Sequence, residues 1–123
     1  GREATAEGRR ARLEERLIVR DGDRIHFLAI DQIDWIEAAD YNVRIHAGEV
    51  VHTLRERLSN LEERLEPRAF VRIHRSALVN LSRVKGLQRW MSGTYRVLLE
   101  DGTELRMSRR GLRKLEGALG RTI

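Results

Sequence analysis

Short apolar runs separated by turn residues make up most of this chain between residues 17 and 107. Apolar runs of roughly 4–8 residues bounded by Gly, Asp, Asn or Ser are typical of β-strands, and Asp21-Gly22-Asp23 is a hairpin signature. The expected strands, in chain order, are Leu17–Val19, Ile25–Ile30, Ile33–Ala39, Val43–His46, Val50–Thr53, Phe70–Ile73, Ala77–Leu81, Val84–Trp90, Tyr95–Leu99 and Thr103–Met107. The sequence therefore predicts a mainly β, antiparallel fold.

Two segments have a helical pattern instead. Leu54, Leu58, Leu61 and Leu65 recur at spacings of four, three and four, which predicts one main amphipathic helix over residues 54–65. The only proline, Pro67, follows this segment. A short C-terminal helix is expected after Ser108, which is a suitable N-cap, with its leucines at positions 112, 115 and 119.

Length and composition limit the classes of protein to which this chain can belong. The 123 residues correspond to one domain. Residues 1–16 are polar and are expected to be a linker or a tail from a preceding region, so the folded domain is expected over residues 17–123. No apolar run approaches the roughly 20 residues of a membrane span, and the absence of cysteine excludes disulfides and thiolate metal sites. These properties favour a cytoplasmic protein.

The placement of charge is more informative than its total. The net charge is +5, a modest excess that a well-solvated surface also explains. The basic residues gather, however, at Arg72–Arg75, Arg83–Arg89 and Arg106–Lys114, and Lys85 and Lys114 are the only lysines. The planar arginine fork suits bidentate contact with phosphate or with the guanine edge. The clusters therefore favour nucleic acid as a partner.

Residues 70–80, FVRIHRSALVN, interleave apolar side chains with hydrogen-bonding groups. A polar group buried without a partner costs about 1–3 kcal/mol, so a segment that only filled a core would not carry so many donors. Arg75 is expected to face outward, since a buried charge needs a carboxylate partner. Ser76 and Asn80 are instead expected to close turns, as small polar side chains frequently do.

No pair of consecutive helices with a short turn is expected, which excludes a helix-turn-helix. Five ordered motifs carry a different resemblance: DQIDWIEA (residues 31–38), YNV (41–43), TLRERLSNLEERL (53–65), FVRIHRSALVN (70–80) and MSRR (107–110). On these motifs the chain resembles the LytTR-type DNA-binding domain of bacterial response regulators, from about residue 25 to residue 119. The resemblance implies an elongated antiparallel β-fold with one main helix.

The resemblance also implies a function. Such a domain is expected to be the output part of a two-component transcriptional regulator, to insert loops into successive major grooves of double-stranded DNA, and to bind and bend tandem promoter repeats. An amino-terminal receiver domain in the full-length protein and a dimer on DNA are the partners that it implies.

Three DNA-facing loops are carried over by position: Asp40–Arg44, His74–Ser76 and Ser108–Arg110. Arg75 and Arg110 are expected to read base edges, and the amide of Asn42 is a candidate for reading adenine. The full set of expected DNA contacts is Asn42, Arg44, Arg72, His74, Arg75, Lys85, Arg89, Ser108, Arg109 and Arg110. The residues expected to hold phosphates and set the register are Arg72, His74, Lys85, Arg89 and Arg109. For Ser76 a phosphate contact is the alternative to the turn-closing role that we favour.

Other function classes have weaker support. A protein-interaction or dimerisation module, using the 54–65 helix or a strand edge, is the main alternative, and a single-stranded RNA binder that depends on Tyr41 and Trp90 is a further one. His46 and His52 lack a third metal ligand, and His74 with Ser76 lacks an orienting acid. We therefore expect no enzyme activity, no metal and no cofactor, and we expect Trp35 in the core.

Overall fold

The computed structural model describes residues 16–65 and 69–123. The strands are β1 (Arg16–Asp21), β2 (Arg24–Ala29), β3 (Trp35–Ala39), β4 (Asn42–Ala47), β5 (Val50–Leu54), β6 (Phe70–His74), β7 (Ala77–Asn80), β8 (Val84–Arg89), β9 (Tyr95–Leu99) and β10 (Glu104–Met107). The α-helices are α2 (Leu58–Leu65) and α3 (Arg109–Leu119), and the 3-10 turns are η1 (Ile30–Gln32), η2 (Leu81–Arg83) and η3 (Met91–Gly93). Each expected strand has a counterpart whose ends agree to within two residues.

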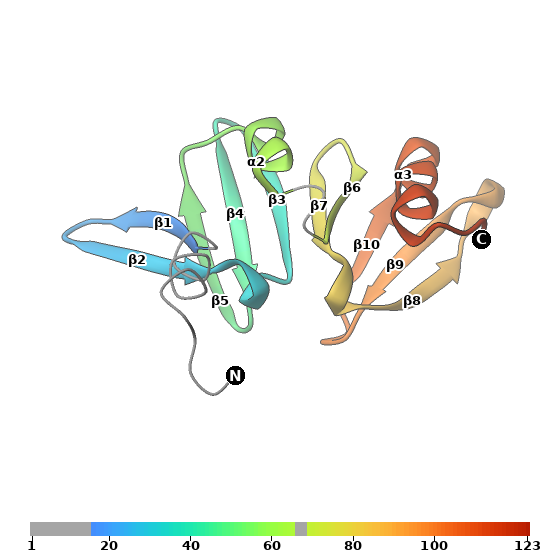
Figure 1. Cartoon of the computed structure of the whole chain (residues 1–123), viewed down its shortest axis with the longest axis horizontal. Coiled ribbons are helices and arrows are strands. Elements are labelled where there is room, and N and C mark those ends of the chain that lie inside the picture. The colour runs from blue at the N-terminus through green and yellow to red at the C-terminus, as the bar shows by residue number, and fades with distance from the viewer. Residues whose placement is uncertain (1–15, 66–68) are drawn as a thin grey trace, which may run out of the picture.

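The strands form three antiparallel sheets in a row, which gives the molecule the elongated shape seen in Figure 1. The hairpin β1-β2 lies at one end, a five-stranded sheet of order β5-β4-β3-β7-β6 lies in the middle, and the sheet β10-β9-β8 lies at the other end. The prediction of a mainly β, antiparallel and elongated fold is confirmed. The linker expected over residues 1–16 lies outside the described residues, apart from Arg16, as does Pro67.

The main helix begins at Leu58, so the prediction that it begins at Leu54 is wrong. Leu54 is instead the last residue of β5, where it pairs with Val43 of β4. The carboxylate of Glu56 accepts hydrogen bonds from the backbone N–H of Arg57 at 3.0 Å and from the side chain of Asn60 at 2.8 Å. These bonds satisfy donors at the start of the helix, and the β-branched residues before it favour the strand.

The five-stranded sheet carries a hydrophobic core on each face. On β7, Leu78 points into the core that contains the leucines of α2, while Val79 points into the core that contains Leu115 of α3. Successive residues of one strand, which point to opposite faces of the sheet, therefore join the two halves of the molecule. Trp35 is half-buried, packs against the second core and stacks on His46 with ring centroids 4.3 Å apart.

Within residues 16–65 and 69–123, neither helix has the length and apolar character needed to cross a membrane.

Candidate nucleic-acid interface

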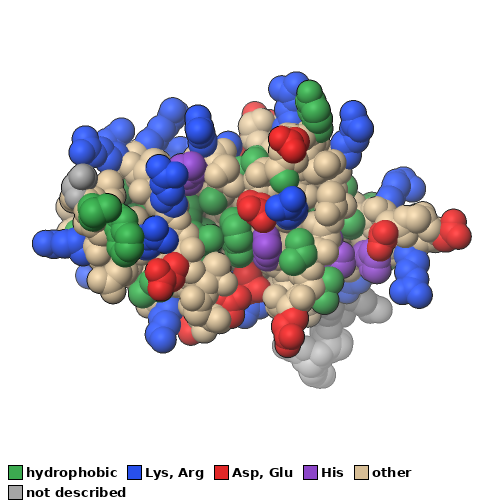
Figure 2. All heavy atoms as spheres, turned by 180° about the vertical axis from the view of Figure 1, so that it is seen from behind, with side chains coloured by type: hydrophobic (Ala, Val, Ile, Leu, Met, Phe, Trp, Pro, Cys, Tyr) green, Lys and Arg blue, Asp and Glu red, His purple; other side chains and the backbone are tan. Residues whose placement is uncertain are grey.

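Three loops meet along one long edge of the molecule, the upper edge in Figure 1. They are the β3–β4 turn, the β6–β7 turn and the start of α3. The backbone N–H of Ala38, at the end of β3, donates to the carbonyl of Ser76 at 2.9 Å, and the N–H of Ser108 donates to the carbonyl of Ile73 at 2.9 Å. These bonds fix the loops to one another. Figure 2 shows several Lys and Arg side chains along this edge.

The β6–β7 turn presents Arg75 to solvent. Beneath it, Nδ1 of His74 accepts the backbone N–H of Ser76 at 3.2 Å and also lies 2.9 Å from the Ser76 hydroxyl. Nδ1 is therefore the acceptor, and Nε2 carries the proton of the neutral ring. Partial burial and the charges of Arg106, Arg75 and Arg72 lower the pKa of His74, so the ring is neutral at pH 7.

The guanidinium of Arg72 holds this turn from inside the protein. Its Nε donates to the carbonyl of His74 at 3.1 Å, a second nitrogen donates to the carbonyl of Arg75, and a third donates to Glu62 at 2.7 Å. All parts of the guanidinium fork thus contact protein groups. Arg72 therefore positions His74 and Arg75. The expectation that it also holds a phosphate stays a prediction.

Glu62 of α2 connects the helices on either side of the turn. Its carboxylate accepts from Arg72 on β6 at 2.7 Å and from Lys114 on α3 at 2.6 Å. Burial alone raises the pKa of Glu62, but the hydrogen bonds from Lys114 and Arg72 outweigh burial and leave the pKa below its ordinary value. The sequence does not identify Glu62 as a site residue, because the helical spacing of the leucines does not show which residues of other elements a charged side chain will contact.

The start of α3 is locked against β6. The Ser108 hydroxyl accepts from the N–H of Gly111 at 3.0 Å, which confirms the expected N-cap, and lies 3.3 Å from the carbonyl of Ile73. A Cβ atom at Gly111 would lie only 1.9 Å from that carbonyl, so the close approach requires glycine. Arg109 and Arg110 follow the cap and are exposed.

A hollow of about 230 Å³ lies between the β6–β7 turn and α3. It is lined by Glu62, Arg72, His74, Arg75, Ser108, Arg110 and Lys114. The structure therefore brings together five of the residues that the sequence pointed to, from two loops that lie more than thirty residues apart in the chain.

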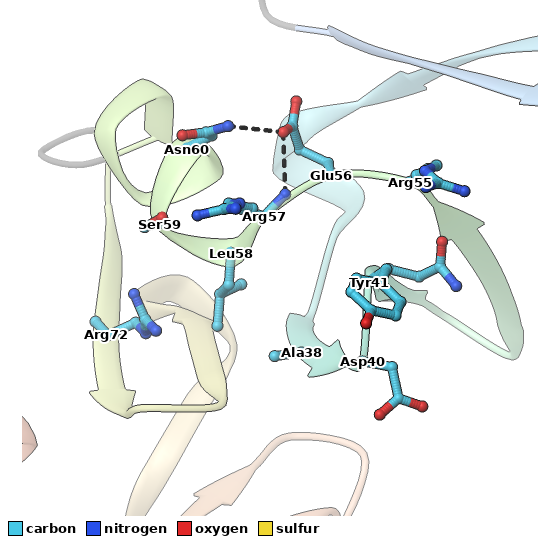
Figure 3. Close-up of a pocket in the computed structure, with 11 residues that line it drawn as sticks. Ala38, Asp40, Tyr41, Arg55, Glu56, Arg57, Leu58, Ser59, Asn60 and Arg72 are labelled. Atoms are coloured by element: carbon cyan, nitrogen blue, oxygen red, sulfur yellow. Dashed lines mark hydrogen bonds between the residues drawn. The ribbon is translucent and has the colours of Figure 1, made fainter.

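A second and more open hollow, of about 640 Å³, lies beside the β3–β4 turn. Asn42 lines it, and Figure 3 shows Arg55 and Arg57 around it together with the exposed ring of Tyr41. Sequence reasoning missed Arg55 and Arg57 because they fall inside the stretch that it assigned to the helix. Arg44 does not line this hollow, and its guanidinium lies 3.7 Å from the carboxylate of Glu37.

Lys85 and Arg89 are exposed on β8 and line neither of these hollows.

Asn80 and Ser76 have the structural roles expected of them. The buried side chain of Asn80 donates to the carbonyl of Ile33 at 2.8 Å and accepts from the N–H of Ser82 at 3.0 Å, which confirms it as a turn closer.

Two alternative hypotheses, a metal site at His46 and a partner-binding surface on α2, can be compared with the contacts of these residues. Nε2 of His46 lies 3.0 Å from Glu37, and in the described part of the chain no three His, Cys, Asp or Glu side chains are grouped to hold a metal ion. The apolar side of α2 is buried: Leu58, Leu61 and Leu65 all pack in its own core, which leaves this side unavailable to a partner.

The family model described as the LytTr DNA-binding domain matches residues 23–120. The transcriptional regulatory protein LytR of Staphylococcus aureus (strain N315) is 31% identical over 117 residues, covering 95% of this chain and 48% of that protein. The sensory transduction protein LytT of Bacillus subtilis (strain 168) is 26% identical over 106 residues, covering 86% and 44%. This chain therefore spans about half the length of these relatives.

Among solved structures, a LytTr DNA-binding domain from Bacillus cereus superposes with a TM-score of 0.77 at 22% identity. The match covers 86% of this chain and 97% of that one, so the two share essentially the whole fold.

Proposed function

This chain belongs to the LytTr DNA-binding domain family, and we propose that it binds double-stranded DNA sequence-specifically as the output domain of a bacterial transcriptional regulator. Its targets are paired promoter repeats, which it reads through loops in the major groove. The relatives named as regulatory and sensory transduction proteins support this assignment.

One observation carries the proposal: three exposed arginines project from backbone that is fixed by internal hydrogen bonds. Arg75 stands on a turn held by Arg72, and Arg109 and Arg110 follow a capped helix start that is bonded to β6. Because the backbone that carries these guanidinium groups is already ordered, only side-chain freedom is lost when they bind base edges and phosphates.

The proposed roles follow from the positions of these residues. Arg75 and Arg110, beside one hollow, contact base edges, and Arg109 and His74 contact phosphates. Lys85 and Arg89 on β8 give further phosphate contacts. Asn42 and Arg44 form the weaker contact of the β3–β4 loop. Ser108 and Arg72 act mainly by positioning their neighbours.

The test begins with selection of bound sequences from a random DNA pool. Arg75→Ala is then expected to weaken binding to the selected duplex by about 5- to 150-fold, which corresponds to the loss of one base contact of about 1–3 kcal/mol. Binding to random DNA should change far less. The matched control is Arg24→Ala, since Arg24 lies in the β1–β2 hairpin, away from the proposed interface. Equal titrations of Arg75→Ala and the control would contradict the assignment.

An amino-terminal receiver domain in the full-length protein and a dimer on DNA are also part of the proposal. The greater length of the relatives supports the first. Sedimentation of the complex tests the second, because a duplex with two repeats should bind two copies of the domain.

Self-association through the β1–β2 hairpin is the second candidate. Ile18 and Phe27 pair across the hairpin and are 56% and 64% exposed, and Ile25 on the same strand is 52% exposed. An exposed apolar group of this kind fits a second copy of the chain. If this candidate were the main function, the chain would associate without DNA and without dependence on salt.

A further inference from the structure

A third hollow, of about 530 Å³, borders the candidate interface on the side of the β8–β9 turn. Its lining residues are His74, Trp90, Met91, Thr94, Tyr95, Arg96, Arg106, Met107 and Ser108. His74 and Ser108 also line the hollow that contains Arg75 and Arg110, so the two hollows are adjacent. None of the nine lining residues is acidic.

Arg96 and Arg106 give this hollow its charge. They are paired across β9 and β10, on the face of the C-terminal sheet opposite Val97 and Leu105, which lie in the core. Neither arginine forms an ion pair with any of the residues that the structure describes, in contrast to Arg72, which is bound to Glu62. Two cations that face one hollow without a carboxylate repel each other, and a bound anion would remove this repulsion.

Trp90 fixes the position of one of these arginines. The guanidinium carbon of Arg96 lies 4.1 Å from the centre of the Trp90 ring, a cation–π contact. The Arg96 Nε is buried and has no hydrogen-bond partner among the described residues. The arginine is thus held by stacking, and its hydrogen-bonding capacity is not used up by the protein.

The tip of the same turn is unusually apolar for an exposed loop. Trp90 is 45% and Met91 is 72% exposed. In Figure 2, hydrophobic side chains lie beside Lys and Arg at the end of the C-terminal sheet. A deoxyribose, with its apolar face next to a phosphate, matches this combination of surface groups.

We propose that this hollow binds a backbone phosphate of the DNA, next to the bases contacted by Arg75 and Arg110, and that Trp90 and Met91 pack on the adjoining sugar. The site rests on the function proposed above and extends the contact surface to a fourth loop. Arg96 and Arg106 form charge-assisted hydrogen bonds to the phosphate, and Trp90 positions Arg96.

The experiment compares Arg96→Gln and Arg106→Gln with Arg24→Gln, which removes the same charge from the distant β1–β2 hairpin. Each of the first two is expected to weaken binding about fivefold or more, and equally for selected and random duplexes, because a phosphate carries no sequence information. The slope of log affinity against log salt should also fall, and in the double variant, which loses both arginines, it should fall by about 0.9 for the one phosphate contact. Trp90→Phe should retain most of the affinity and Trp90→Leu should not.

The outcomes separate this site from the function on which it rests. If the wild type binds its selected duplex and Arg96→Gln titrates like Arg24→Gln, the phosphate site is wrong and the proposed function stands. A loss confined to the selected duplex would indicate a base contact and would also overturn the site. If the wild type selects no sequence, the proposed function fails and the phosphate site fails with it.

A second measurement identifies the source of the phosphate. In a Trp35→Phe background, Trp90 is the only tryptophan and reports on the hollow. Its fluorescence should respond to micromolar duplex and to inorganic phosphate only at far higher concentrations. A saturable response to low inorganic phosphate would show a site for a free anion and would overturn the assignment to DNA.

Discussion

Glu62 binds the arginine that holds the β6–β7 turn, although it lies on α2 and not in a loop. It is bound to Arg72 at 2.7 Å and to Lys114 at 2.6 Å. Glu62→Gln leaves both cations without their counter-charge, so we expect the free energy of unfolding to fall by about 1–3 kcal/mol. Affinity for the selected duplex should fall more than affinity for random DNA, because Arg72 no longer holds the turn that carries Arg75.

Glu63→Gln is the matched control, since Glu63 is the next residue of the same helix and is exposed. It should change neither stability nor the ratio of selected to random affinity. Urea denaturation and fluorescence anisotropy measure the two quantities. If Glu62→Gln lowered stability but kept the affinity ratio, Glu62 would stabilise the fold without positioning the turn.

His74 makes stability depend on pH in a defined direction. Burial, Arg106, Arg75 and Arg72 lower its pKa in the folded protein, so the unfolded chain takes up the proton first as the pH falls through about 6.5. The free energy of unfolding should therefore decrease from pH 7.5 to pH 5.5. His74→Asn, whose Oδ1 can accept the Ser76 amide, should remove part of this decrease.

The pH range is chosen so that Glu62 does not contribute. Its lowered pKa means that its stabilising effect is lost only below the ordinary carboxyl value of about 4.5. Urea titrations at several pH values give the comparison. Parallel stability curves for the wild type and His74→Asn would show that His74 has no part in the pH dependence.

Helix α3 offers a matched pair of glycines. At Gly111 a Cβ would collide with the carbonyl of Ile73, whereas at Gly117 a Cβ would meet nothing within 4 Å apart from its chain neighbours and the nearby backbone of its own helix. Gly111→Ala should push the helix from β6 and cost about 3 kcal/mol or more. Gly117→Ala should raise stability by about 0.5–1 kcal/mol through helix propensity.

The same pair separates helix position from helix stability. At a temperature where both variants are folded, Gly111→Ala should bind the selected duplex more weakly, because Arg109 and Arg110 are displaced, and Gly117→Ala should bind like the wild type. Thermal denaturation and gel shifts provide the readings. Normal binding by Gly111→Ala would mean that the start of α3 is not part of the interface.

The sequence predicts individual elements of this molecule better than their ends or their contacts. The strands and the Ser108 cap follow from local patterns that the structure retains. The predicted helix start lies four residues before the observed one, because Leu54 fits the helical spacing although its backbone pairs with Val43. At such a boundary the helical spacing of the leucines favours a helix and pairing with the neighbouring strand favours a strand. Only the tertiary structure decides between the two.

The arrangement of the interface was only partly predictable. The motifs pointed to His74, Arg75 and Arg110, which the structure places around one hollow. Nothing in the sequence distinguishes Arg96 from the other arginines, because its partners depend on the register between β9 and β10 and on the contact with Trp90 across the turn. Residues whose contacts come from segments far apart in the sequence cannot be identified from local sequence patterns.

The two hydrophobic cores should unfold as one unit, because β7 belongs to both. Leu78 and Val79 are fully buried on opposite faces of the central sheet. Leu78→Ala creates a cavity in the first core and should cost about 2–5 kcal/mol. If the cores are coupled, the slowest-exchanging amides of β4 and of β9 should lose equal protection, although β9 lies in the other half.

Hydrogen exchange followed by NMR measures this coupling, and Val50→Ala on the exposed edge of β5 is the control that should change neither strand. Unchanged exchange in β9 would show two independent units. The distinction bears on DNA binding, since the β3–β4 turn belongs to one half, and Arg96 and α3 belong to the other. Only a single cooperative unit keeps the spacing between these contacts fixed, and a fixed spacing is what allows several loops to meet successive grooves in register.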